Sequence, residues 1–193
     1  MEQKQNISEI VEKIKNISLK DNIPIVREKT INKIIEIINN KKYNSYLEIG
    51  TAYGYSISKI IENTHIKLLT SIEKNIENYK IARNVLKNYS INLINDNAFL
   101  YTPDMKFDFI FVDGPKSHQE KLVTKYLNFL NKDGTVFIDN IFLKKFDNIV
   151  QKTKNQIKLI EKVTNFRNWL QNNLIFKCEI YDIDDGYAIL QLK

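Results

Sequence analysis

Three residues with oxygen-bearing side chains stand where two apolar segments of the chain end. Asp113 closes the segment 107–113, and Asp139 with Asn140 closes the segment 135–139. If these segments are adjacent parallel strands, their C-terminal ends share one edge of the sheet, which places the three side chains beside a ligand-binding loop. Oxygen ligands with room for water suit Mg²⁺ or a similar hard cation. We therefore predict a metal site here; the alternative is that the three residues are solvated caps of strand ends.

A loop with two glycines follows the first strand-like segment. Residues 47–56 read Leu-Glu-Ile-Gly-Thr-Ala-Tyr-Gly-Tyr-Ser, at the point where a doubly wound sheet binds its ligand. We expect Gly50 to permit a tight turn and Gly54 to let the backbone approach a ligand and the next helix. Ser56 is placed to donate a hydrogen bond to a carboxylate near that helix's N-terminus. The spacing differs from G-x-G-x-x-G, which disfavours a dinucleotide. A turn without a ligand is the alternative.

Strand-like and helical segments alternate along most of the chain, which is typical of βαβ units with a parallel sheet. The chain ends differently, because two strand-like segments surround Asp184-Asp185-Gly186 and predict an antiparallel hairpin. The expected strands are 46–49, 67–73, 91–95, 107–113, 135–139, 175–181 and 187–192, and the expected helices are 7–17, 28–40, 55–63, 75–88, 117–131 and 155–172. We predict an α/β fold with a central, mostly parallel sheet that ends in an antiparallel hairpin, and with helices on both faces.

The composition limits the class of protein. The chain has 193 residues, 29 Lys and Arg against 23 Asp and Glu, and only 5 Gly and 3 Pro, which excludes collagen-like and low-complexity classes. The length and the 43% of hydrophobic residues suit a single domain over 1–193, with residues 1–40 as an N-terminal helical extension. No apolar stretch is long enough to span a membrane, the first residues show no export signal, and a lone cysteine, Cys178, forms no internal disulfide. We expect a soluble, cytoplasmic protein without a membrane partner.

The segment Glu48-Ile-Gly-x-x-x-Gly-Tyr-Ser56 resembles motif I of the metal-dependent O-methyltransferases, which include catechol and caffeoyl-CoA enzymes. The resemblance implies a Rossmann-like class I methyltransferase fold and S-adenosylmethionine as methyl donor. In this family an acidic residue at the position of Glu73 binds the ribose hydroxyls, and Asn97-Ala98 stands at the adenine site, with Asn97 in place of the usual Asp. A surface carboxylate and a polar turn are the alternatives at these two places. The cofactor-binding residues implied are Glu48, Gly50, Gly54, Tyr55, Ser56, Glu73, Asn97, Ala98 and Asp113.

The segment Asp113-Gly-Pro-Lys116 repeats the family's Asp-x-x-Lys, in which the lysine is the base for the substrate hydroxyl. Gly-Pro between the two residues is a departure from most members. The resemblance implies that Asp113 and Lys116 are catalytic and that Asp113, Asp139 and Asn140 hold the metal. A nearby dication and partial burial both favour an uncharged amine. The expected reaction is methyl transfer to an oxygen of a substrate with two neighbouring oxygens, since both can chelate the ion.

The C-terminal part of the chain resembles one branch of this family. The segments Lys162–Leu170 and Asp185–Ile189, together with Ile23-Pro24-Ile25, resemble the bacterial tRNA 5-hydroxyuridine methyltransferases. The resemblance implies that the acceptor is the 5-hydroxyl of the wobble uridine, that tRNA is the partner, and that the chain forms a homodimer. Basic residues that we consider for phosphate contacts are Arg27, Arg83, Arg167, Lys144, Lys145, Lys152, Lys154 and Lys158. The alternatives are a surface ion pair for Arg167 and a solvated helix face for the lysines.

Two other functions remain open at this point. A small-molecule O-methyltransferase for catechol-like substrates would use the same donor and metal residues. An RNA-binding protein without catalytic activity is the third possibility, because Asn97 and the Gly-Pro sequence before Lys116 depart from the family pattern. The net charge of +6 agrees with an RNA partner but also follows from the many lysines of an Ile-, Lys- and Asn-rich chain.

Overall fold

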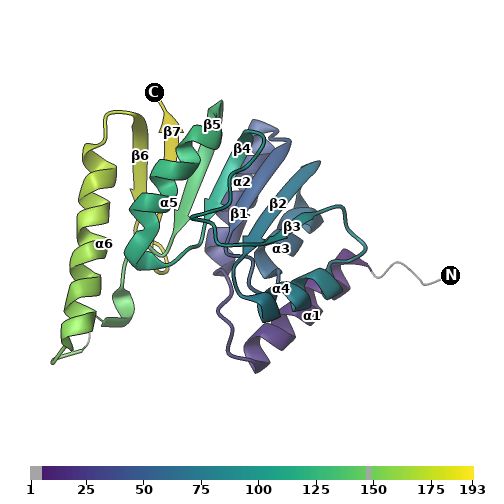
Figure 1. Cartoon of the computed structure of the whole chain (residues 1–193), viewed down its shortest axis with the longest axis horizontal. Helices are drawn as coiled ribbons and strands as arrows, with labels where there is room; N and C mark the ends of the chain where they lie inside the picture. The colour runs from purple at the N-terminus through teal and green to yellow at the C-terminus, as the bar shows by residue number, and fades with distance from the viewer. Residues whose placement is uncertain (1–5, 147–148) are drawn as a thin grey trace. The chain divides into compact units, whose positions relative to one another are not determined.

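The computed structural model describes residues 6–146 and 149–193, except for the side chain of Lys145 (Figure 1). By its internal contacts the chain divides into two compact units, residues 1–104 and residues 105–193. The expected single domain over 1–193 stays a prediction. Within the described ranges, no helix has both the length and the apolar character that crossing a membrane requires.

The first unit (residues 1–104) combines three parallel strands with four helices. Its elements are α1 (Ile7–Lys20), α2 (Glu28–Lys41), β1 (Ser45–Ile49), α3 (Tyr55–Asn63), β2 (Leu68–Glu73), α4 (Ile76–Val85) and β3 (Asn92–Asn95). The strands pair in the order β3-β2-β1, and each pair is parallel. Both N-terminal helices contact α3, and Ile14 and Ile34 from their apolar stripes are fully buried. Each such side chain contributes about 1.5–3 kcal/mol of burial free energy.

The second unit (residues 105–193) contains four strands and two longer helices. Its elements are β4 (Phe107–Val112), η1 (Lys116–His118), α5 (Gln119–Tyr126), η2 (Leu127–Phe129), β5 (Leu130–Asp139), η3 (Lys144–Phe146), α6 (Lys154–Asn172), β6 (Phe176–Tyr181) and β7 (Tyr187–Leu192). β4 and β5 pair in parallel, whereas β7 is antiparallel to both β5 and β6. The predicted change from parallel strands to a closing antiparallel hairpin is therefore confirmed.

The helix predicted over 117–131 is too long. α5 ends at Tyr126, and β5 already begins at Leu130. The register of β4 against β5 shifts between the pairs Phe107–Leu130 and Phe109–Thr135, so the extra residues of β5 are accommodated in a bulge. Glycine is required there, because a Cβ atom on Gly134 would lie 2.9 Å from the backbone carbonyl oxygen of Asp108.

α6 is fixed at its start by capping and near its end by aromatic contacts. Thr153 and Gln156 form a reciprocal capping box at its N-terminus, a pattern that stabilises a helix end. Near the other end, the ring of Trp169 lies 5.8 Å from that of Phe166 and 5.5 Å from that of Phe176 in β6. Figure 1 shows α6 running alongside β6. Trp169 therefore anchors the helix to the sheet of this unit.

Candidate active site

The glycine loop of the first unit has an unusual backbone conformation. Gly50, Ala52 and Gly54 have positive φ angles of 102°, 48° and 94°, which glycine adopts at little cost and alanine rarely adopts. A Cβ atom on Gly54 would lie 2.7 Å from a methyl carbon of Leu86. Gly54 is thus needed both for the turn and for the close approach of the loop to Leu86, the residue that caps α4.

The carboxylate of Glu73, at the end of β2, holds this loop in place. One of its oxygens accepts a hydrogen bond from the Ala52 N–H at 2.8 Å, and the other accepts one from the Asn75 N–H at 2.7 Å. A carboxylate offers about four acceptor positions. Glu73 therefore retains capacity for the ribose hydroxyls that the sequence assigns to it, and it also stabilises the strained Ala52.

Glu48 lies behind the loop and has no solvent-exposed surface. The hydroxyl groups of Ser56 and Ser71 both donate to its carboxylate, Ser71 at 2.6 Å, and the hydroxyl of Thr51 lies 2.6 Å from that of Ser71. Burial raises the pKa of Glu48 to about 7, the serine hydroxyl groups counteract this rise, and the charge of Glu73 adds to it. Glu48 therefore supports the predicted cofactor loop from inside and accepts the hydrogen bond of the Ser56 hydroxyl. The expected hydrogen bond from Ser56 to a carboxylate at the ligand-binding end of the helix stays a prediction.

Tyr55 is also buried, and its hydroxyl group lies 3.5 Å from the carboxylate of Glu28 in α2. Burial raises the pKa of Tyr55, and the charge of Glu28 raises it further. Tyr55, which the resemblance assigns to the cofactor site, therefore connects α3 to α2.

Asn97 and Ala98 follow β3 in a turn that Asn97 itself stabilises. The Asn97 side-chain oxygen accepts a hydrogen bond from the Phe99 N–H at 3.1 Å, and its backbone carbonyl accepts one from Tyr101 at 3.0 Å. The amide oxygen that we expect to accept from the adenine amino group thus already accepts one bond. A carbonyl oxygen has two lone pairs, so a second donor can be bound there.

Asp139 is the centre of the polar cluster at the end of β5, and only 4% of its surface is exposed. Burial raises the pKa of Asp139 to about 7 and the charge of Asp113 raises it further, while the Asn140 N–H and the charge of Lys116 act in the opposite direction. The Asn140 amide nitrogen donates to the Asp139 carboxylate at 2.9 Å. The three predicted metal ligands and the predicted base are therefore neighbours within the second unit.

The donor chemistry of this cluster fits a hard divalent cation. Two carboxylates that repel each other are stabilised by a dication between them, and an amide oxygen completes a set that Mg²⁺ favours. Lys116 Nζ donates to the Asn140 side-chain oxygen at 3.2 Å, which leaves one lone pair of this oxygen for a cation. Among the described residues, no group of three or more His, Cys, Asp or Glu side chains is arranged to hold a metal.

Two features around Asp139 were not predicted from the sequence. The buried side chain of Gln119, the first residue of α5, donates to the backbone carbonyl of Asp139 at 2.8 Å. Asn140 has a positive φ of 59°, which is uncommon for a residue with a side chain. No pattern in the sequence marks Gln119, because its role depends on a contact with a strand 20 residues later.

The segment after Asn140 is held by the closing hairpin and by α6. The N–H groups of Ile141 and Phe142 donate to the carbonyls of Gly186 and Asp185 at 3.1 and 2.9 Å. Arg167 donates to the Ile141 carbonyl at 3.0 Å, and its guanidinium carbon lies 4.6 Å from the centre of the Phe142 ring. The Phe142 ring also lies so close to Gly186 that a Cβ atom there would overlap it, at 1.9 Å. Arg167, one of only three arginines, thus has a structural role beside the one predicted for it.

A model of one protein family, the O-methyltransferases, matches residues 2–192. The chain belongs to the O-methyltransferase family. The predicted family and the prediction of an S-adenosylmethionine-dependent O-methyltransferase are thereby confirmed.

Known structures resemble this O-methyltransferase over nearly all of its length. A crystal structure from Staphylococcus aureus, provisionally named as a caffeoyl-CoA O-methyltransferase, is 27% identical, covers 95% of this chain and 92% of its own, and has a TM-score of 0.87. The Podospora anserina methyltransferase PaMTH1, solved with S-adenosylhomocysteine, is 21% identical over 97% of this chain and 87% of its own, with a TM-score of 0.81. The predicted Rossmann-like methyltransferase fold is therefore confirmed.

A relative with a different acceptor is also similar in sequence. A Thermoplasma volcanium protein, provisionally named as a decarboxylating cobalt-precorrin-6B C(15)-methyltransferase, is 29% identical over 153 residues, which are 77% of this chain and 72% of the relative. The relatives of this O-methyltransferase thus carry the names of different methyl acceptors.

Proposed function

We propose that this O-methyltransferase transfers the methyl group of S-adenosylmethionine to the 5-hydroxyl of 5-hydroxyuridine at the wobble position of tRNA. The observation that carries the proposal is the cluster in which Asp113, Lys116 and Asn140 surround the buried Asp139. Such a cluster suits an acceptor with two adjacent oxygens, as in the 5-hydroxyl and 4-oxygen of this base. The resemblance of the C-terminal segments to the tRNA enzymes supports the choice of nucleoside.

The proposed roles follow from the positions of the side chains. In the first unit, Glu73 and the Asn97-Ala98 turn bind the donor, and the loop supported by Glu48 shapes its site. In the second unit, Asp113, Asp139 and Asn140 would hold a divalent cation such as Mg²⁺, which lowers the pKa of a bound hydroxyl group. Lys116, as the free amine, accepts the proton of the acceptor hydroxyl. The sulfonium S–CH₃ bond breaks as the O–CH₃ bond forms, leaving S-adenosylhomocysteine and a protonated Lys116.

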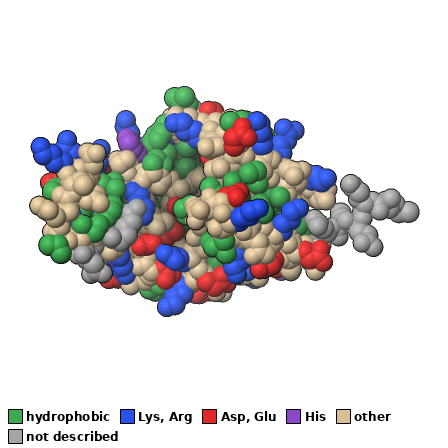
Figure 2. Space-filling view, turned by 90° about the horizontal axis from the view of Figure 1, so that it is seen from below, with side chains coloured by type: hydrophobic (Ala, Val, Ile, Leu, Met, Phe, Trp, Pro, Cys, Tyr) green, Lys and Arg blue, Asp and Glu red, His purple; other side chains and the backbone are tan. Residues whose placement is uncertain are grey.

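The RNA part of the proposal depends on particular basic residues and not on the overall charge. On the face shown in Figure 2, Lys and Arg side chains are interspersed with Asp and Glu side chains. A mixed surface of this kind gives little long-range attraction for a polyanion at physiological salt. On this face, contacts with phosphate therefore depend on local clusters of cations.

A small-molecule acceptor is the second candidate function. It is favoured by the similarity to the Staphylococcus aureus structure with the caffeoyl-CoA name, since a catechol-like ring also presents two adjacent oxygens. The donor residues and the cation ligands would be the same. The two candidates differ only in the acceptor, so the experiment must offer both.

The test is a methylation assay with labelled S-adenosylmethionine, Mg²⁺, and either tRNA that carries 5-hydroxyuridine or a free catechol. We expect 5-methoxyuridine by nucleoside mass analysis, and no product with tRNA that carries unmodified uridine. Lys121→Ala, an exposed lysine of α5, is the control for Lys116→Ala. Methylation of catechol without any tRNA product would overturn the proposal in favour of the second candidate. Tight RNA binding without any binding of S-adenosylmethionine would instead indicate a protein without catalytic activity.

A further inference from the structure

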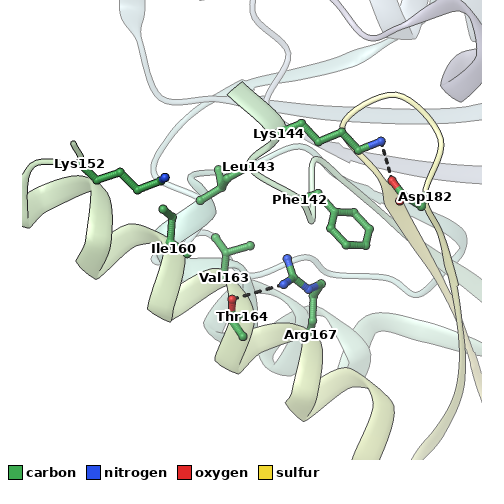
Figure 3. Close-up of a pocket in the computed structure, with 9 residues that line it drawn as sticks. All are labelled: Phe142, Leu143, Lys144, Lys152, Ile160, Val163, Thr164, Arg167 and Asp182. Carbon is green, nitrogen blue, oxygen red and sulfur yellow. Dashed lines mark hydrogen bonds and ion pairs between the residues drawn. The ribbon is translucent and has the colours of Figure 1, made fainter. Parts of the chain in front are cut away.

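A cavity of about 270 Å³ lies in the second unit, between α6 and the segment that follows Asn140 (Figure 3). One wall is the segment 142–144, which follows Asn140 by two residues, and the opposite wall is α6. Side chains of α6, among them Ile160, Val163 and Arg167, point from the helix toward this segment. The volume lies just below the roughly 300–1,000 Å³ that ligand pockets span, and suits a ligand the size of a sugar with its phosphate.

The charges of this cavity favour an anion. Lys144, Lys152 and Arg167 contribute three positive charges, and Asp182 contributes one negative charge, which leaves a balance of +2. Lys144 Nζ lies 2.5 Å from the Asp182 carboxylate, so the acidic residue neutralises one of the three cations. Lys152 donates to the Ile149 carbonyl at 2.8 Å, and an ammonium group has three N–H donors.

The arginine of this cavity is held in a fixed orientation. Its N–H groups donate to the Ile141 carbonyl at 3.0 Å and to the Thr164 hydroxyl at 3.3 Å, and its guanidinium group lies against the Phe142 ring. A guanidinium group has five N–H donors, of which the described residues take two. Because the side chain is already ordered, little conformational entropy is lost when it binds an anion.

The cavity also has an apolar side, formed by Phe142, Leu143, Ile160 and Val163. A bare inorganic anion gains nothing from such a wall, whereas the ribose carbons and the base of a nucleotide are stabilised by apolar contact. Cations beside an apolar wall are therefore more suitable for a nucleotide than for a free ion.

We propose that this cavity is a subsite for one nucleotide of the RNA acceptor, with its phosphate bound by Lys144, Lys152 and Arg167. The inference rests on the proposed function and extends it, since it names where a nucleotide other than the one being methylated is bound. The segment 142–144 follows Asn140 after one intervening residue, Ile141, so we expect a nucleotide in the cavity to fix the register of the RNA relative to the cluster. In this arrangement Asp182 weakens binding, because phosphate competes with it for Lys144.

The experiment uses substitutions that change the charge of the cavity in opposite directions. For tRNA with 5-hydroxyuridine, we expect Lys152→Ala to weaken binding roughly fivefold and to reduce the salt slope of log K by about 0.7–0.9, the value for one lost phosphate contact. Asp182→Asn should strengthen binding roughly twofold to threefold, since it frees Lys144. Lys121→Ala is the control, because Lys121 is an exposed lysine of α5 in the same unit that does not line the cavity. Thermal unfolding verifies that each variant is folded.

The outcomes separate this inference from the proposed function. If tRNA is methylated but Lys152→Ala and Asp182→Asn both behave like the Lys121→Ala control, the subsite is wrong and the function stands. If no tRNA is methylated but RNA affinity still changes in opposite directions, the function is wrong and the cavity remains an RNA phosphate site. As a second probe, uridine 5′-monophosphate should bind more tightly than uridine, and Lys152→Ala should remove the difference. Equal binding of the two compounds would contradict the proposal.

Discussion

Two buried carboxylates in this enzyme have the same raised pKa of about 7 and differ in the side chains nearest to them. Glu48, in the first unit, is enclosed by hydroxyl groups of Ser56 and Ser71. Asp139, in the second unit, is surrounded by charged groups, with Asp113 as the main source of repulsion and Lys116 as a partial balance. Burial is the largest cause of the raised pKa at both sites.

The neighbours of these two carboxylates indicate that Glu48 has a structural role and that Asp139 does not. Hydroxyl groups rotate and can satisfy either the protonated or the ionised form of Glu48, so its surroundings need no ligand. Charged groups cannot adapt in this way. The repulsion between two adjacent carboxylates, such as Asp113 and Asp139, is relieved only by a proton or a cation. A shifted pKa alone therefore does not identify a reactive residue. Whether such a residue is reactive or structural depends on the groups that surround it.

The largest effect is expected from replacing Asp139, the carboxylate with charged neighbours. Asp139→Asn keeps the shape of the side chain but removes the negative charge that a cation and the reacting groups require. We expect methyl transfer to fall by at least about 100-fold, with the affinity for S-adenosylmethionine unchanged within about twofold when measured by calorimetry. Glu48→Gln is the matched control and should retain most activity. Full activity of Asp139→Asn in the presence of a chelator would rule out the metal-assisted mechanism.

A loss of activity is also expected at Lys116, the cation that partly balances Asp139. Lys116→Ala removes the proposed base, which typically accounts for a factor of about 10²–10⁴. Because solvent hydroxide can take over part of this role, the variant should recover activity steeply as the pH rises, whereas Lys121→Ala should follow the profile of the natural enzyme. A pH profile of unchanged shape would show that Lys116 is not the base.

For Glu48 the expected effect is on stability and its pH dependence. The folded pKa of about 7 lies above the ordinary value of 4.5, so from pH 4.5 to 7 the folded state holds a proton that the unfolded state has lost. The free energy of unfolding therefore falls as the pH rises through this range, by up to about 3 kcal/mol. Glu48→Gln should lack this fall, and urea unfolding at several pH values measures it. Parallel curves for the two proteins would contradict the assignment.

The smallest effect is expected from removing one hydroxyl neighbour of Glu48. Ser71→Ala deletes the donor at 2.6 Å and should lower the free energy of unfolding by about 1–3 kcal/mol. It should also steepen the loss of stability with pH, because the ionised form of Glu48 loses a donor. Ser58→Ala is the control, since Ser58 is equally buried but donates only to the Tyr55 carbonyl. An equal pH dependence of both variants would argue against the role of Ser71.

The elements near the functional loops could be predicted well from the sequence because their signals are local. α3 begins and ends where the glycine loop and the apolar spacing place it, and the hairpin surrounds Gly186 as expected. The end of α5 was mispredicted because Tyr126, Leu127 and Leu130 continue a helical spacing although Leu130 already belongs to β5. Short apolar runs suit either structure, and only strand pairing decides between them.

The sequence placed polar residues at strand ends but could not show their surroundings. The clustering of Asp113, Asp139 and Asn140 follows from the order of the strands and could be predicted. The enclosure of Glu48 could not, because it depends on the register that sets Glu48 opposite Ser71 in the neighbouring strand. Contacts of this kind join residues far apart in the chain, and no spacing rule reveals them.

The contact between Gly186 and Phe142 has a consequence for the evolution of this family. A side chain at position 186 and a large ring at position 142 exclude each other, since a Cβ atom would lie 1.9 Å from the ring. Related chains with alanine or serine at position 186 should therefore carry a residue smaller than phenylalanine at position 142. The two positions are expected to change together across homologues, although they are 44 residues apart and belong to different structural elements.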